Sequence, residues 1–266
     1  MQTLIVNLRL FWRGALLSYV ALFTWFRPAA YAASKIVGPL AQILFFTFLG
    51  TYATGTGNAH FYVIGNAMQI AAVSGIFGVT LSIGGDRWNG TLPYLFGTPA
   101  NRFVLFFGRA FIHILDGALG VMIGFIWGVV LLGLDMGQTN IGLLALTILV
   151  TTLSTCGLGL LMGCVGLITV NIMFVNNTVY FLLLIFSGAN IPLNTLPAWV
   201  QVISSGLPLT RGIAAARALI TGANWQDIAP LVGGELAVGL VYGFLGYILF
   251  SWFETQAKRT GKLESV

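Results

Sequence analysis

Long apolar runs dominate the chain and are broken by only a few polar segments. No Asp, Glu, Lys or Arg occurs from Ile36 to Gly85, and none lies between Asp135 and Arg211. The runs are continuous instead of alternating, which is typical of membrane-spanning helices and not of β-barrel strands. Crossing the hydrocarbon core takes about 20 apolar residues, so each run is long enough for at least one transmembrane helix.

The pattern predicts six transmembrane helices. They cover approximately residues 35–52, 61–84, 103–134, 141–167, 171–187 and 231–253. The third is longer than the bilayer requires, so we expect its beginning to lie outside the hydrocarbon. Backbone groups in lipid must be hydrogen bonded within the protein. The predicted fold class is therefore an all-α polytopic membrane protein, with one transmembrane domain over residues 1–266.

The N-terminal segment has a different, amphipathic pattern. Apolar residues recur every three or four positions, at Leu4, Leu8, Phe11, Trp12, Ala15, Leu16 and Tyr19. Asn7, Arg9 and Arg13 lie off this stripe. The purely apolar part, Gly14 to Phe26, is too short to span, and Pro28 interrupts any helix. We predict a helix over 3–26, within an interfacial segment 3–30. A tilted first span is the alternative.

Composition and charge support a membrane environment. Charged residues make up 7% of the chain, against about 25% in a soluble domain. The net charge of +5 does not indicate nucleic-acid binding, because the basic residues are dispersed beside apolar spans. With six spans, one side holds Arg9, Arg13, Arg27, Lys35, Arg87, Arg102, Arg109, Lys258, Arg259 and Lys262. The other side holds Arg211 and Arg217. The excess predicts a multi-pass cell-membrane protein, plasma or inner membrane, with both termini cytoplasmic.

A charged segment, residues 85–102, separates the second and third predicted spans. It reads Asp86-Arg87, then Gly90-Thr91-Leu92-Pro93, then Thr98-Pro99, then Arg102. Such a polar loop between two long apolar spans is often a docking surface. Gly90 and Pro93 would shape its turn, and Thr91 would cap a short helix. The plainer interpretation is an ordinary charged loop without a partner.

This segment resembles the signature of ABC-2 type permeases, the membrane subunits of one class of ABC transporters. The departure is Pro93, where the family usually has Glu. The resemblance continues after the fifth predicted span. It includes 187–193, 196–199, 207–210 and 217–222, which read SGANIPL, LPAW, LPLT and RALITG.

The resemblance carries further implications. It implies a type V exporter-like fold, with residues 85–102 as the coupling helix and 188–230 as extracellular or re-entrant short helices. The coupling helix would dock on a separate ABC ATPase, present in two copies and binding ATP and Mg. Two permease chains would pair as a homodimer or heterodimer within membrane lipid. The cargo would be a hydrophobic or amphiphilic compound, drug-like, antibiotic-like or lipid, or alternatively a lipid-linked glycan.

The chain itself is not expected to be an enzyme or to hold a cofactor or metal. Its Gly261-Lys262 pair has Gln256 where a P-loop needs its first glycine, so any ATPase must be a separate polypeptide. His60 is a lone histidine without a second ligand nearby. Cys156 and Cys164 lie in one apolar run, where packing is favoured over a disulfide. A membrane-embedded enzyme would need convergent reactive groups, and a channel would need a filter or charged rings.

Arg109, His113 and Asp116 are the ionisable residues inside the third predicted span. Their spacings of four and three place them on one helix face, where they could form an internal polar network. Ionisable groups inside a membrane usually face protein or water. A proton relay and a structural pair are both open. The same span carries Gly120, Gly124 and Gly128, a small-residue ridge that would serve either intrachain packing or a dimer.

Overall fold

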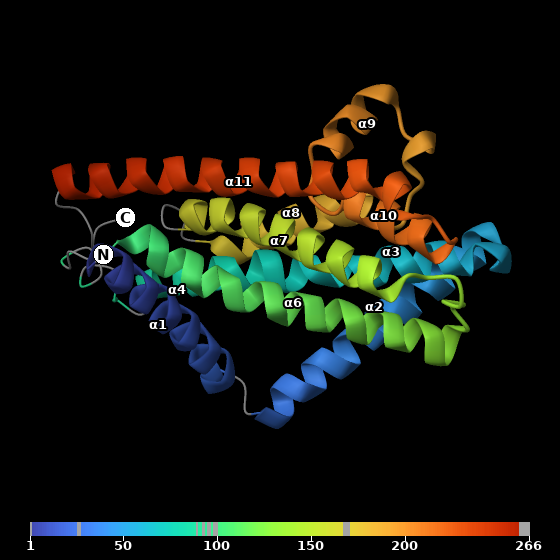
Figure 1. Cartoon of the computed structure of the whole chain (residues 1–266), viewed down its shortest axis with the longest axis horizontal. Helices are drawn as coiled ribbons and strands as arrows, with labels where there is room; N and C mark the ends of the chain where they lie inside the picture. Colours follow the sequence, from blue (N-terminus) through green and yellow to red (C-terminus); the bar gives the residue numbers. More distant parts are fainter. Residues whose placement is uncertain are drawn as a thin grey trace.

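The computed structural model is a helical bundle (Figure 1). It describes residues 2–25, 28–88, 101–166 and 171–260, together with Gly90, Thr91, Tyr94 and Gly97. The described helices are α1 (Gln2–Trp25), α2 (Pro28–Thr54), α3 (Ala59–Ala72), α4 (Val79–Trp88), α6 (Arg102–Leu132), α7 (Ile141–Gly166), α8 (Ile172–Phe186), α9 (Ala198–Ser205), α10 (Thr210–Ile220) and α11 (Trp225–Thr260). A π-helical turn, η2 (Val73–Gly78), joins α3 to α4, and short 3₁₀ turns occupy Thr56–Asn58 and Leu193–Thr195.

The prediction of an all-helical membrane protein is confirmed. Within the described residues, five helical stretches are long and apolar enough to cross a membrane: Ala29–Thr54, Thr56–Gly85, Val104–Leu132, Ile141–Gly166 and Trp225–Gln256. The remaining predicted span corresponds to α8, an apolar helix of 15 residues. At 1.5 Å per residue, α8 is about 22 Å long, which is shorter than the hydrocarbon core.

Three of these helices begin where the sequence places an asparagine. The side chain of Asn101 accepts a hydrogen bond from the amide of Val104 at the start of α6, at 3.3 Å. Asn140 and Asn171 make the equivalent bonds at the starts of α7 and α8, at 3.1 Å each. An N-cap residue satisfies an otherwise unpaired amide of the first turn. The predicted starts at 103, 141 and 171 therefore lie close to the observed ones.

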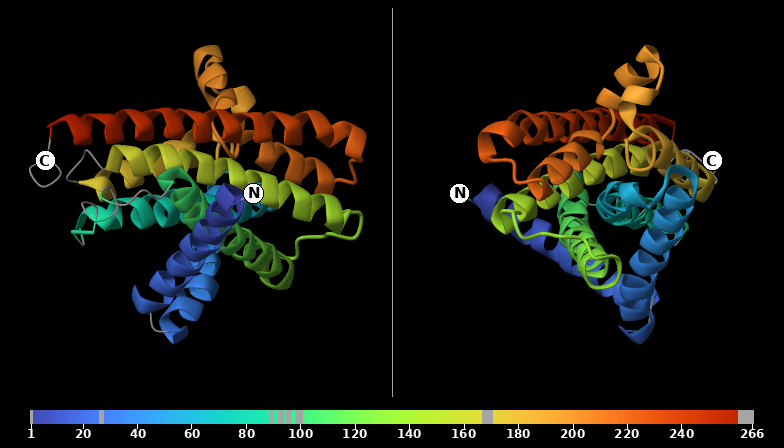
Figure 2. Two further views of the ribbon diagram at one scale, coloured as in Figure 1. Left: turned by 60° about the vertical axis from the view of Figure 1, so that its left-hand side comes forward. Right: turned by 90° about the vertical axis from the view of Figure 1, so that its right-hand side faces the viewer.

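The N-terminal part forms two helices that meet at an angle (Figure 2). α1 ends at Trp25 and α2 begins at Pro28, as the helix-breaking proline predicts. α2 starts earlier than the predicted residue 35. Lys35 therefore lies two turns inside α2 and not at the first residue of the helix, as the predicted span implied.

α1 packs against α6 through two glycines. A side chain at Gly14 would meet the carbonyl oxygen of Leu105 at 2.7 Å, and one at Gly108 would meet the backbone of Phe11. Beside this contact, the Phe11 ring lies 5.5 Å from the Phe111 ring. The predicted helix over 3–26 is thus present and attached to the bundle.

The hydrophobic core lies between α3, α6, α7 and α10. Residues 62–72 of α3 are all buried. Fully buried side chains of this core include Met68, Ile76, Leu209, Ile213 and Leu219. α2 and α11, by contrast, leave most of their surface uncovered by protein. This is the distribution expected of outer helices whose apolar side chains face lipid.

The connection predicted over 188–230 is shorter than expected. α9 and α10 are short helices within it, but α11 already begins at Trp225, six residues before the predicted start. The acidic Asp227 in the first turn favours a helix start there, and Asp227 Oδ2 accepts from the amide of Asn224 at 3.0 Å. Pro230 removes only one internal hydrogen bond, so the helix continues through it.

Four chain positions lie at one end of the bundle. These are the start of α1, the end of α4, the beginning of α6 and the end of α11 (Figure 1). α9, α10 and the beginning of α11 lie toward the opposite end. The charged segment therefore occurs at the same end as both termini of the described chain.

Candidate functional site

The first candidate site is the charged segment between α4 and α6. Asp86 and Arg87 occupy the last turn of α4. Gly90 has a φ of 65°, a left-handed conformation that glycine adopts without steric cost. Tyr94 and Gly97 are helical, and Asn101 caps α6. Leu92, Pro93, Thr98 and Pro99 lie outside the described residues, as do the side chains of Asp86, Arg87 and Arg102.

The described residues between α4 and α6 are exposed. The side chain of Tyr94 is 79% exposed, and Thr91 is also exposed. Side chains added at Gly90 or Gly97 would have no neighbouring atom within 4 Å. These described residues are thus accessible to another protein.

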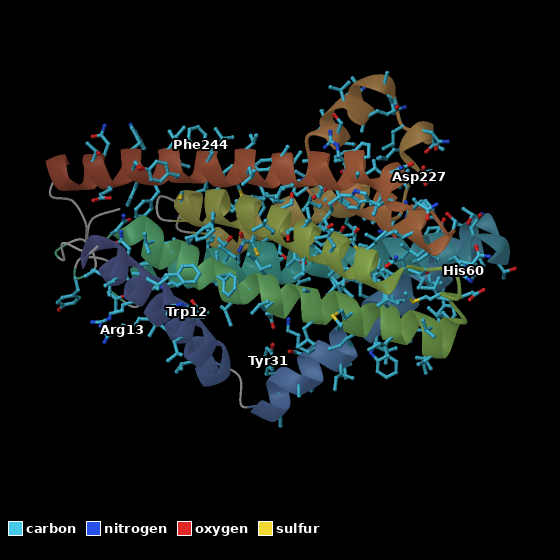
Figure 3. All side chains as sticks on the ribbon, in the orientation of Figure 1. Trp12, Arg13, Tyr31, His60, Asp227 and Phe244 are labelled. Carbon is cyan, nitrogen blue, oxygen red and sulfur yellow. The ribbon has the colours of Figure 1, made fainter. Side chains whose placement is uncertain are left out.

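The second candidate site surrounds Asp116, near the middle of α6. Lys35 Nζ of α2 forms an ion pair with Asp116 Oδ2 at 2.6 Å. Ser74 Oγ of η2 donates to the same oxygen at 2.6 Å and accepts from Lys35 Nζ at 3.0 Å. The Tyr31 hydroxyl donates to Asp116 Oδ1. Figure 3 labels Tyr31 at the beginning of α2. We call Tyr31, Lys35, Ser74 and Asp116 the Asp116 cluster.

The other two predicted residues of this helix face lie closer to the α4 end. His113 is buried, and its imidazole occupies the space that a side chain at Gly78 would need. The guanidinium of Arg109 donates to the carbonyl of Ser82 at 2.7 Å and stands 5.4 Å from the centre of the Phe106 ring. The three residues therefore contact the neighbouring span, α3–η2–α4, at three successive positions along its length.

These contacts show how Asp116 is held, and the choice between a structural pair and a proton relay stays a prediction. Its carboxylate accepts from an ammonium and two hydroxyl groups, so its oxygens are already occupied by donors of the protein. The sequence did not predict Tyr31, Lys35 or Ser74 as partners. They are 85, 81 and 42 residues from Asp116. The one available signal was that Lys35 is the last charged residue before a long uncharged run.

Sequence reasoning also missed Glu235, a fully buried acid within α11. Its carboxylate accepts from the backbone amides of Leu209, Arg211 and Gly212, at 2.7, 3.2 and 3.1 Å. These amides belong to the beginning of α10, where a negative charge is stabilised by the helix dipole. Leu209 has a φ of 76°, which is uncommon for a residue with a side chain. Glu235, a residue of α11, thus fixes the strained start of α10 to that helix.

Arg217 joins α10 to the opposite side of the core. Its guanidinium donates to the carbonyls of Phe61 at 3.0 Å and Ala189 at 3.1 Å, and lies 3.6 Å from the centre of the Phe61 ring. Burial lowers the pKa of Arg217 to about 10, which leaves the group charged at neutral pH. The signal in the sequence was the arginine inside the otherwise apolar stretch 213–220.

Two further predictions concern cysteines and metals. Cys156 and Cys164 are both free and buried within α7. In the parts of the chain that the structure describes, no three His, Cys, Asp or Glu side chains gather as metal ligands would.

The long apolar helices define a multi-pass integral membrane protein. The family model described as ABC-2 type transporter matches residues 14–221, and the chain belongs to this family. No curated protein sequence matches the chain. Members of the family are membrane-spanning transport components that work with an ABC ATPase.

Proposed function

We propose that this chain is the permease subunit of an ATP-driven ABC exporter. It would move a hydrophobic or amphiphilic compound out of the cytoplasm or inner leaflet, while a separate subunit hydrolyses ATP. The family match over residues 14–221 carries this proposal. The exposed segment between α4 and α6 supports it, because a permease without its own ATPase needs a surface that receives force.

The proposed membrane topology has six spans and an interfacial α1. α8 would serve as the fifth span, and the bilayer would adapt to its short length by local thinning. Both termini and residues 85–102 would face the cytoplasm, where basic residues accumulate. Trp12 and Arg13 on the uncovered side of α1 support its interfacial position (Figure 3).

The proposed mechanism uses residues 85–102 as a coupling helix. Two ATPase subunits would dock on two permease chains, which form either a homodimer or a heterodimer. Closure of the ATPases on Mg-ATP would displace the coupling helices, and α4 and α6 would carry that displacement into the bundle. An accessible surface between two rigid helices suits this role, since a force applied there moves both of them.

The apolar surface supports the proposed cargo class. Uncovered Phe, Leu and Ile side chains along α2 and α11 face the lipid, from which an amphiphile would enter. A drug-like or antibiotic-like compound and a lipid both fit. A lipid-linked glycan is the alternative cargo within the same family.

Charge reversal at Arg87 tests the docking surface. We expect Arg87→Glu to reduce transport by about tenfold or more, within the range of coupling free energies between sites, while membrane insertion stays intact. Arg87→Lys is the matched control and should keep most activity, because it retains the charge. ATP hydrolysis and substrate efflux of the assembled complex in liposomes would be measured together.

Two results would contradict the docking proposal. One is wild-type transport in Arg87→Glu. The other is the failure of any ABC ATPase to co-purify with the wild-type chain in mild detergent. Stimulation of ATP hydrolysis by candidate compounds, measured on the same liposomes, would distinguish lipid, drug-like and glycan cargo.

A further inference from the structure

The second membrane-spanning stretch changes its helical geometry beside Asp116. η2, Val73–Gly78, is a π-helical turn between α3 and α4. Such turns contain an extra residue and occur frequently at functional positions. The neighbouring carbonyl of Ala71 accepts a hydrogen bond from the hydroxyl of Thr155 in α7, at 3.2 Å. The irregular turn is therefore supported by contacts with another helix.

α6 contacts both ends of this turn. Near its first end, Ser74 is bonded to Asp116. At its last residue, Gly78 makes room for His113. α7 covers another side so closely that a side chain at Gly159 would overlap the carbonyl oxygen of Gly75. The turn is thus enclosed between α6 and α7, and Asp116 supplies the charged contact.

The two halves on either side of the turn have different surroundings. α3 is fixed to the far end of the bundle by the bonds of Arg217 and by Asn66, whose amide donates to Asn190 Oδ1 at 2.8 Å. Ser187 adds a bond to Gln69 at 3.3 Å. α4, in contrast, leads directly into residues 85–102. α4 is itself bonded to α6 through Arg109 and Ser82. The π-turn therefore separates the half fixed at the far end of the bundle from the half that packs on α6 and ends at the proposed coupling segment.

Asp116 connects this turn to α2 as well. Lys35 bonds to both Asp116 and Ser74, so one carboxylate joins three elements: α2, η2 and α6. The side chains of Lys35 and Asp116 are only 17% and 10% exposed. A charge pair removed from water interacts more strongly and tolerates separation poorly.

We propose that Asp116 is a positioning residue that transmits movement of the coupling segment to α2. Its bonds to Ser74 and Lys35 keep the π-turn and α2 at fixed positions relative to α6. Displacement of α4 therefore moves these elements together. This inference rests on the proposed docking of an ATPase at residues 85–102.

A distance measurement between α2 and α11 tests this role independently of the cargo. Spin labels would be placed at Gly38→Cys and Gly243→Cys, since neither glycine has an atom within 4 Å of an added side chain. The assembled complex with its ATPase would be measured before and after addition of Mg-ATP and vanadate. We expect the label distance to shift in the otherwise wild-type complex and the shift to be lost in Asp116→Asn.

Two double variants test whether the Lys35–Asp116 contact acts through its opposite charges or only through the space that the two side chains fill. Lys35→Asp with Asp116→Lys exchanges the pair and should restore the shift. Lys35→Met with Asp116→Leu replaces the pair by apolar groups, a change that often preserves stability, and should leave the shift lost. Asp135→Asn, in the exposed loop after α6, is the matched control and should behave as the wild type.

The outcomes are distinguishable. A normal shift in Asp116→Asn, no shift in the wild type, or recovery by the apolar pair overturns the positioning role. If Asp116→Asn does not assemble, the double variants decide: recovery by the exchanged pair alone supports the proposal, and any other result opposes it. Failure of the ATPase to bind the wild-type chain instead refutes the proposed docking function.

Discussion

Glu235 shows how much one side chain contributes to the arrangement of the short helices. Its carboxylate is fully buried and pairs with three backbone amides of the α10 start. A buried amide without a partner is costly, and so is a buried carboxylate without donors. The two groups therefore stabilise each other, and α10 is fixed to α11 at this point.

Removal of the carboxylate should consequently destabilise the protein. For Glu235→Ala we expect a loss of roughly 3 kcal/mol or more, because three buried amides lose their acceptor. The apparent unfolding temperature in detergent should fall by about 5–10 °C. Glu254→Ala, near the other end of the same helix, should change it little. An equal effect of both substitutions would contradict the specific role of Glu235.

At the scale of elements, close helix contacts are made by glycines. The ridge of Gly120, Gly124 and Gly128 packs within the chain, since side chains there would meet Ile70 and Val63 of α3. The contact between α1 and α6 has the same basis at Gly14 and Gly108. Small residues permit the backbones to approach, which increases van der Waals contact where lipid provides no hydrophobic drive.

The α1–α6 contact can be tested at Gly108. In Gly108→Val the added side chain would overlap the backbone of Phe11, so α1 must shift. We expect a loss of about 1–3 kcal/mol, the usual cost of overpacking. Tryptophan fluorescence should also change, because Trp12 lies against Phe111, with ring centroids 6.2 Å apart. Gly38→Val, with open space around it, is the control, and equal destabilisation by both would argue against this contact.

At the scale of the whole molecule, both ends of the described chain share one end of the bundle with the end of α4 and the beginning of α6. The proposed orientation predicts that this end is cytoplasmic. Tyr94 and Trp199 are suitable reporters because their side chains are 79% and 67% exposed, near opposite ends. The native Cys156 and Cys164 are buried and should give little background.

Labelling with a membrane-impermeant maleimide would measure this orientation. We expect Trp199→Cys to react in intact cells and Tyr94→Cys to react only after the membrane is opened. The unsubstituted chain is the control for background labelling. Reaction of Tyr94→Cys in intact cells would reverse the proposed topology and remove residues 85–102 from the reach of a cytoplasmic ATPase.

Much of the fold could be predicted, because membrane helices are governed by local properties. The uncharged runs place most helices to within a few residues, and the structure shows asparagine caps at three of the starts. The π-turn at 73–78 was not predicted, since its apolar sequence is compatible with a regular helix. α11 begins six residues before the predicted span, because Asp227 favours a helix start and the one hydrogen bond lost at Pro230 is tolerated.

The sequence by itself determined that the chain crosses a membrane and that a polar segment, 85–102, interrupts its apolar runs. It also placed Arg109, His113 and Asp116 on one helix face. Only the tertiary structure decided which groups pair. Lys35, Tyr31 and Ser74 donate hydrogen bonds to Asp116. Glu235 accepts from the backbone at the start of α10. The physical reason is that a helix in lipid satisfies its backbone locally. A buried charge must find its partner across the bundle, and that pairing depends on how the helices pack.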